Sequence, residues 1–180
     1  SGDQSTWWGF YVTDVTDDGY CIDRYSPRNS WQKYGRRGSS ISGMNIEHSF
    51  AQSWWGKTNC NLKKDLFNIM PCESKINSSM GIVTKVTNTN GATKVGSGAN
   101  GLSLWEPADE WKGDFARGYM YIVTAYEDYA NKWQSEGSNS LYNNTYPTLK
   151  EWAYKLYIQW AKEDKPDAVE IKRNNDVAKI

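Results

Sequence analysis

Hydrophobic positions in the second half of the chain repeat every three or four residues, the spacing of one face of an α-helix. The first series, between 109 and 130, consists of Phe115, Tyr119, Ile122, Tyr126 and Tyr129. The second series, from 148 onward, consists of Leu149, Trp152, Ala153, Leu156 and Trp160. Thr148 and Glu151 have the spacing of a capping box, which predicts Thr148 as the N-cap. A last short helix is predicted from Asp167.

The first half of the chain has strand and loop patterns instead. Residues 6–13, TWWGFYVT, are aromatic and β-branched and predict a strand. Residues 26–43 are rich in serine and glycine and predict a loop, after which strand character returns over 45–52. The segment DLFNIMP leads through Pro71 into a short helix or turn that carries Asn77.

A hairpin is predicted next, because GIVTKVT (81–87) and TKVGSG (93–98) are joined by a segment that contains Asn-Gly. The chain shows no internal repeat and no linker composition. The pattern therefore predicts one α+β domain over 1–180.

Composition fits a globular domain with a substantial core. Of 180 residues, 38% are hydrophobic, and 10 Trp and 12 Tyr supply large side chains. The mean hydropathy is −0.78, and no apolar run approaches the length of a membrane span, so no membrane partner is expected. Cys21, Cys60 and Cys72 allow one disulfide at most, and their spacing gives no C-x-x-C pair, which argues against a zinc ribbon.

Charge is balanced overall but unevenly distributed. Residues 28–94 hold ten Lys and Arg against three acidic residues, and the rest of the chain carries the compensating negative charge. This segment is a candidate surface for a polyanion such as nucleic acid. An ordinary solvated surface is the alternative.

The only histidine, His48, follows Glu47 directly. A neutral imidazole can take a proton from water near pH 7, and carboxylate and amide oxygens suit Mg²⁺ or Ca²⁺. With nearby lysines, these groups could hydrolyse a phosphodiester. A structural or exposed histidine is the alternative. Neighbouring side chains on a regular strand point to opposite faces, so a shared site requires a bend or bulge between Glu47 and His48.

Three segments carry a family resemblance. NIEHSFAQSWWG, DLFNIMP and KINSSM (45–80) resemble the endonuclease I pattern N-x-E-H-x-x-P-x-S-W-x-G, D-L-H-x-L-x-P and N-x-x-R/K-S-N. Residues 106–130 resemble the entry to the long helix of that family, and residues 143–180 resemble its C-terminal helices. The resemblance implies a His-Me finger (ββα-metal) core with a small antiparallel sheet and several packed helices. It also implies a bacterial, secreted or periplasmic, sequence-tolerant endonuclease for DNA, with RNA left open.

The resemblance also implies roles for individual residues. His48 matches the general base, and Glu47 and Asn77 match the ligands of one divalent cation, Mg²⁺ first and Ca²⁺ or Mn²⁺ as alternatives. Lys57 is the candidate phosphate contact, and Asn68 matches a supporting position. No organic cofactor is implied.

Other residues are assigned more generally. Asp65 is expected to form an Asx-type turn in support of the finger. The candidates for further nucleic-acid contacts are Lys63, Lys64, Lys75 and Arg117, with a structural ion pair as the alternative for Arg117. Trp54 and Trp55 could stack on bases, but core packing is the stronger expectation. A Cys60–Cys72 disulfide stays open.

The chain departs from the family pattern at three places. Ala51 replaces the usual proline, SSMGIV follows Asn77 where relatives have a basic residue and SNYP, and family segments at both ends are missing, which predicts a trimmed chain. Two alternatives to a nuclease follow from the sequence. One is a binding module of the same fold without turnover, and the other is a carbohydrate-binding module that uses the aromatic residues.

Overall fold

The computed structural model describes residues 5–55, 60–77, 82–83, 93–97, 103–129, 133, 145 and 147–180, with side chains left out at 77, 82–83, 93–97 and 103–105. This part of the chain is α+β, as expected. Its α-helices are α1 (Thr6–Thr13), α2 (Ser74–Asn77), α3 (Lys112–Ala125), α5 (Glu151–Glu163) and α6 (Ala168–Val177). Its strands are β1 (Met44–His48), β2 (Ile69–Glu73), β3 (Ile82–Val83), β4 (Thr93–Ser97) and β5 (Ser103–Glu106). Short 3₁₀ turns cover Arg28–Ser30, Gln52–Trp55, Asn61–Lys63, Asp109–Trp111 and Glu127–Tyr129.

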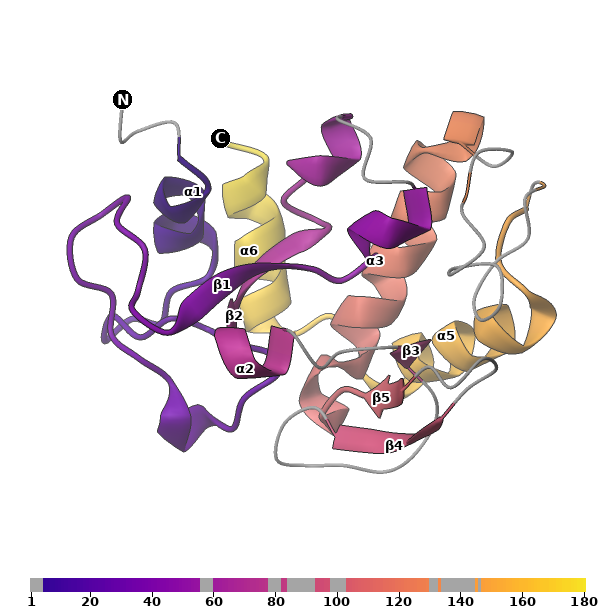
Figure 1. Ribbon diagram of the computed structural model, residues 1–180, viewed down its shortest axis with the longest axis horizontal. Helices are drawn as coiled ribbons and strands as arrows, with labels where there is room; N and C mark the ends of the chain where they lie inside the picture. The colour runs from indigo at the N-terminus through magenta and orange to yellow at the C-terminus, as the bar shows by residue number, and fades with distance from the viewer. Residues whose placement is uncertain are drawn as a thin grey trace.

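Helix α3 forms the centre of the core. It buries Phe115, Tyr119 and Ile122 along one face and packs across α5, whose Tyr157 ring centroid lies 5.1 Å from that of Tyr119 (Figure 1). The predicted helix is therefore confirmed over Lys112–Ala125, whereas Tyr126 is its C-cap and Tyr129 lies in the following 3₁₀ turn. None of the helices in the described ranges is long and apolar enough to cross a membrane.

Strands β1 and β2 form an antiparallel pair whose register runs from Met44↔Glu73 to His48↔Ile69 without a bulge. Helix α2 follows β2 directly and packs against both strands. The strand predicted over 45–52 therefore ends at His48, and Gln52–Trp55 turns back as a 3₁₀ segment. This strand–strand–helix unit contains Glu47, His48 and Asn77.

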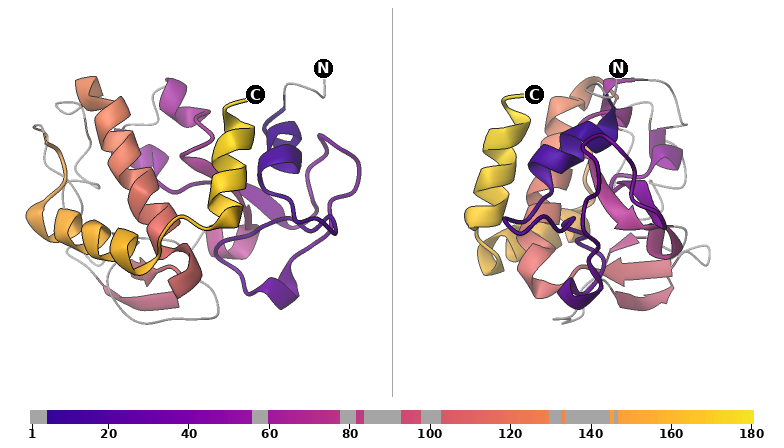
Figure 2. Two further views of the ribbon diagram at one scale, coloured as in Figure 1. Left: turned by 180° about the vertical axis from the view of Figure 1, so that it is seen from behind. Right: turned by 90° about the vertical axis from the view of Figure 1, so that its left-hand side faces the viewer.

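The predicted N-terminal strand is wrong, because residues 6–13 form helix α1. The Ser5 hydroxyl accepts a hydrogen bond from Trp8 N at 3.1 Å as the N-cap, and the helix buries Gly9, Phe10 and Thr13. Figure 2 shows α6 between α1 and α3, and α1 packs against α6. Packing against another helix outweighs the weak strand preference of these residue types.

Two further predictions fail for local reasons. Within the described residues 82–83 and 93–97, β3 and β4 do not pair with each other as the predicted hairpin requires, because β5 lies between them, parallel to β3 and antiparallel to β4. Thr148 does not cap α5: its φ of 75° lies outside the extended region that an N-cap adopts. Lys150 precedes the helix instead. The last helix does begin after Asp167, whose side chain accepts from Glu170 N.

A buried ion pair joins three distant segments. Asp14 accepts from Arg24 Nη1 at 2.6 Å and from Arg173 Nε at 2.8 Å, and Asp14 and Arg24 are almost fully buried. Arg173 also donates to the carbonyls of Leu66 and Ile69, at 2.7 and 3.1 Å. Burial by itself raises the pKa of Asp14, but the two guanidinium groups outweigh it and hold this pKa below its ordinary value.

We predict that Asp14→Asn lowers the free energy of unfolding by about 3–5 kcal/mol, because it leaves two guanidinium groups partly uncompensated in the interior. Urea unfolding at pH 7 measures this loss. Asp17→Asn, which changes an exposed carboxylate, is the matched control and should have little effect. Equal stability of the two variants would contradict the structural role of Asp14.

Candidate active site

The orientation of the His48 ring is set by a main-chain carbonyl. Its Nε2 lies 3.0 Å from the oxygen of Lys63, in the turn Asn61–Lys63. A carbonyl can only accept a hydrogen bond, so Nε2 carries the proton and donates it. The neutral ring then has its lone pair on Nδ1. Burial lowers the pKa of His48 below the ordinary histidine value, which favours this neutral form.

Gln52 covers the same ring. Its Nε2 lies 3.1 Å from His48 Nδ1 and 3.3 Å from His48 Nε2. A donor aligned with the lone pair of one ring nitrogen would lie much farther from the other, so the amide rests against the ring face. The Trp55 ring lies at 6.1 Å from the imidazole, centroid to centroid. These contacts hold the His48 ring in place, and the in-plane lone pair of Nδ1 stays available to accept a hydrogen bond or a proton.

Glu47 lies in different surroundings from His48. It is buried near Tyr25 and Asp23, whereas His48 contacts the turn at Lys63. Burial raises the pKa of Glu47 to about 8, even though hydrogen bonds from Tyr25 and from the His48 amide favour its charged form. The regular register of β1 accounts for the separation, because it contains no bulge that would turn both side chains to one face.

Asn77 is the last residue of α2, the helix that packs against the β1–β2 pair. Its side chain is outside the description. Glu47 and Asn77 supply the hard oxygen donors that Mg²⁺ and Ca²⁺ prefer. Within the described part of the chain, no group of three His, Cys, Asp or Glu side chains is arranged to hold a metal ion.

Asn68 and Asp65 fix the backbone around His48. The fully buried Asn68 side chain accepts from Phe50 N at 2.8 Å and donates to the carbonyl of Leu62 at 3.2 Å, which links the end of β1 to the turn that contacts His48. Asp65 Oδ1 accepts from Phe67 N at 2.8 Å, so the expected Asx-type turn is confirmed.

The candidate phosphate contacts are spread along the surface. Lys64 and Lys75 are exposed, and Lys63 is partly buried. Lys64 also lines an open pocket of about 400 Å³ with Asp65 and Tyr126. Lys57, the first candidate, lies outside the described residues.

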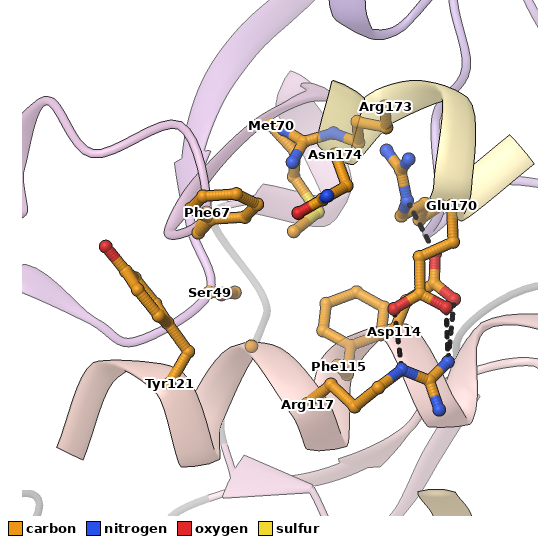
Figure 3. A pocket seen from close by; sticks show the side chains of 12 residues that line it. Ser49, Phe67, Met70, Asp114, Phe115, Arg117, Tyr121, Glu170, Arg173 and Asn174 are labelled. Atoms are coloured by element: carbon orange, nitrogen blue, oxygen red, sulfur yellow. Dashed lines mark hydrogen bonds and ion pairs between the residues drawn. The ribbon is translucent and has the colours of Figure 1, made fainter. Parts of the chain in front are cut away.

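Arg117 is bound to groups on and before α6. Its guanidinium makes a two-point ion pair with Glu170 and donates to the carbonyl of Asp164 at 2.8 Å. It lines a cavity of about 370 Å³ between α3 and α6, where Phe67 and Tyr121 face the charged cluster of Asp114, Arg117 and Glu170 (Figure 3). The structural ion pair is thus present, and the Arg117 side chain is committed to it.

The structure also decides between the alternatives for the tryptophan pair and for the cysteines. Trp54 and Trp55 are 6% and 2% exposed and belong to the core, so they offer no open face to a base. Cys60 and Cys72 do not form a disulfide, and all three cysteines of the chain are thiols.

Two contacts of His48 are absent from the sequence-based set. Gln52 follows His48 by four residues, a spacing that could have suggested proximity only if the chain turned after β1. The Lys63 contact uses a main-chain atom, so no residue type indicates it.

Comparison with known proteins places the chain in a family. The sequence model of the family described as Endonuclease I matches residues 3–180. The extracellular ribonuclease of Bacillus amyloliquefaciens is 28% identical over 140 residues, which cover 77% of this chain and 48% of that protein. The extracellular ribonuclease of Bacillus subtilis is 29% identical over 141 residues, which cover 76% and 47%. The chain thus spans about half the length of these curated relatives. Because the family match extends over nearly all of its residues, the chain belongs to the endonuclease I family.

Proposed function

We propose that this protein is a metal-dependent endonuclease that hydrolyses the phosphodiester bonds of DNA or RNA with little sequence preference. The proposal is supported by the family match over 3–180 and by two relatives named as extracellular ribonucleases. In this proposal the unit β1–β2–α2 is a His-Me finger. The names of the relatives also favour a secreted protein.

The hydrogen bond between His48 Nε2 and the carbonyl of Lys63 is the observation that carries the mechanism. It makes Nδ1 the only ring atom that can accept a proton. We assign His48 as the general base that takes a proton from the attacking water at Nδ1. The lowered pKa keeps the imidazole neutral near pH 7, which is the form that a base requires.

Glu47 and Asn77 are the proposed ligands of one divalent cation, Mg²⁺ in the first place. Because the regular register of β1 turns Glu47 and His48 to opposite faces, this assignment requires β1 to bend between the two residues when the ion binds. When bound, such an ion would stabilise negative charge on the phosphate oxygens and on the leaving oxygen. Glu47 must be ionised for this role, and its raised pKa means that the ion has to displace a proton from the buried carboxyl group.

Lysines would position the substrate by its phosphates. Lys57 is the proposed contact to the scissile phosphate, and the exposed Lys64 and Lys75 are proposed as further phosphate contacts. Phosphate contacts carry no base identity, which accounts for the proposed sequence tolerance.

We predict that the protein nicks supercoiled plasmid, cleaves single-stranded RNA, or does both in Mg²⁺ but not with chelator. His48→Ala should lower the cleavage rate by about 10²–10⁴-fold, the usual contribution of a general base. Gel electrophoresis of both substrates measures the rates and decides between DNA and RNA.

Gln159→Ala, which changes a partly exposed residue of α5, is the control and should keep full activity. If the wild-type chain shifts DNA on a gel but cuts neither substrate in any divalent ion, the result would contradict the nuclease and favour a binding module of the same fold.

We predict that neutral His48 is the Nε2–H tautomer with a pKa below 6.5, the ordinary value. Because the chain has one histidine, a ¹⁵N–¹H spectrum of the imidazole reports this ring alone. A pH titration followed by NMR gives both quantities. An Nδ1–H tautomer would remove the assigned base atom.

We predict that ionisation of Glu47 makes the metal-free protein less stable as pH rises from about 5 to 8. The folded-state pKa of about 8 exceeds the ordinary value of 4.5, so in this window the unfolded chain releases the proton and the folded chain retains it. The free energy of unfolding should therefore fall by at most about 1.4 kcal/mol per pH unit.

Denaturant unfolding of wild type and Glu47→Gln in chelator measures this dependence, which should be weaker in the variant. Asp23, whose pKa burial also raises, contributes a remainder in the same direction. Glu127→Gln, an exposed control, should follow wild type. Identical pH profiles for wild type and Glu47→Gln would show that Glu47 does not keep its proton in the fold.

A further inference from the structure

One segment of the chain is positive without interruption. Residues 24–46 contain five cations and no acidic residue, and Asp23 and Glu47 bound the segment on either side. Arg24 is buried in the ion pair with Asp14, whereas Lys33, Arg36 and Arg37 are exposed. The last three residues are therefore a concentrated positive surface in a chain of zero net charge.

Aromatic rings hold two of these cations in place. The Arg37 guanidinium carbon lies 4.3 Å from the Trp8 ring centroid and 5.9 Å from that of Tyr11. Lys33 Nζ lies 4.9 Å from the Tyr20 ring centroid. Tyr11 also packs edge-on against Tyr34, the residue after Lys33, with ring centroids 5.3 Å apart.

Such contacts hold a cation without neutralising it. A ring attracts the cation by its quadrupole and carries no negative charge. Within the described ranges, Lys33, Arg36 and Arg37 form no ion pair with a carboxylate, unlike Arg28, which binds Glu110 at 2.6 Å. A guanidinium stacked on indole also keeps its in-plane N–H groups available, and these form the two-point hydrogen bonds that phosphate accepts.

The backbone beneath this surface is anchored to the N-terminal part of the fold. Tyr34 N donates to the carbonyl of Gly19 at 3.0 Å, and the Tyr34 hydroxyl donates to the carbonyl of Asp14 at 3.2 Å. The Ser5 hydroxyl donates to the carbonyl of Gly38 at 3.2 Å. The cations are thus presented by a fixed loop, which lowers the entropy cost of binding.

The same loop leads directly into β1, the strand that ends at His48 (Figure 1). We propose that Lys33, Arg36 and Arg37 form a second binding surface for the phosphate backbone of the polynucleotide, away from the scissile bond. This inference rests on the proposed function for the identity of the ligand. It explains how a long strand is retained without base-specific contacts.

The test is binding of a fluorescein-labelled single-stranded oligonucleotide, in chelator, over a range of salt concentrations. Arg36→Gln/Arg37→Gln should weaken binding about tenfold at low salt and reduce the slope of log K against log salt by about 1.4, since each phosphate contact on a single strand contributes about 0.7. Arg37→Lys retains the charge but not the planar guanidinium, so its affinity should lie between that of wild type and that of the double variant. Arg36→Gln alone, which leaves the contacts of Arg37 with Trp8 and Tyr11 in place, guards against a folding defect.

The matched control is Lys162→Gln/Lys165→Gln, which removes the same charge from exposed positions at the end of α5 and beyond it. Its salt slope should equal that of wild type. An equal loss in both double variants, or no loss in Arg36→Gln/Arg37→Gln, would overturn the proposal. Binding of anionic phospholipid vesicles that is lost in this variant, while oligonucleotide binding is kept, would assign the surface to lipid phosphate and overturn it as well.

Cleavage separates this inference from the proposed nuclease. The Arg36→Gln/Arg37→Gln enzyme should show a raised KM for long polynucleotide and an unchanged rate on a dinucleotide, which is too short to reach the surface. If the wild-type protein cuts neither the polynucleotide nor the dinucleotide, but Arg36→Gln/Arg37→Gln loses oligonucleotide binding, the binding surface is supported and the nuclease is contradicted. If the variant cuts both substrates with wild-type constants, the nuclease is supported and the binding surface is contradicted.

Discussion

The position of Asp14 between Arg24 and Arg173 is the constraint on which the arrangement of this fold depends. These residues come from the end of α1, the following loop and α6, and Arg173 also binds the carbonyls of Leu66 and Ile69. Ile69 begins β2 and is the register partner of His48. One buried carboxylate therefore connects the N-terminal helix, the C-terminal helix and the strand pair that presents the imidazole.

This arrangement has an energetic cost that the surroundings offset. Removing three charged groups from water is unfavourable unless each finds partners. Here Asp14 has two guanidinium groups, and Arg173 has two carbonyls in addition. The fully buried amide of Asn68 is likewise satisfied, because it accepts a hydrogen bond from Phe50 N and donates one to the carbonyl of Leu62. Polar groups in this interior act as connections between segments that lie far apart in the sequence.

The sequence predicted the parts of the fold that repeat at a regular spacing. The aromatic series of α3 identified that helix because its buried face is continuous. Residues 6–13 were mistaken for a strand because their types favour one, and only the packing of α1 against α6 decides otherwise. At the candidate site, the family pattern supplied Glu47, His48 and Asn77. The alternation of side chains along a strand already raised the separation of Glu47 from His48, and the register of β1, which has no bulge, decides it. The contact to Lys63 could not be predicted, because it uses a main-chain atom.

The carbonyl partner of His48 has an evolutionary consequence. Any residue at position 63 supplies the same oxygen, so drift in the side chain there leaves the imidazole oriented. What has to persist is the path of the turn Asn61–Lys63, and Asn68 holds that path through the neighbouring carbonyl of Leu62. The interaction nearest to the chemistry is thus hidden from any comparison of side chains, while selection to preserve it would act on a residue that does not touch His48.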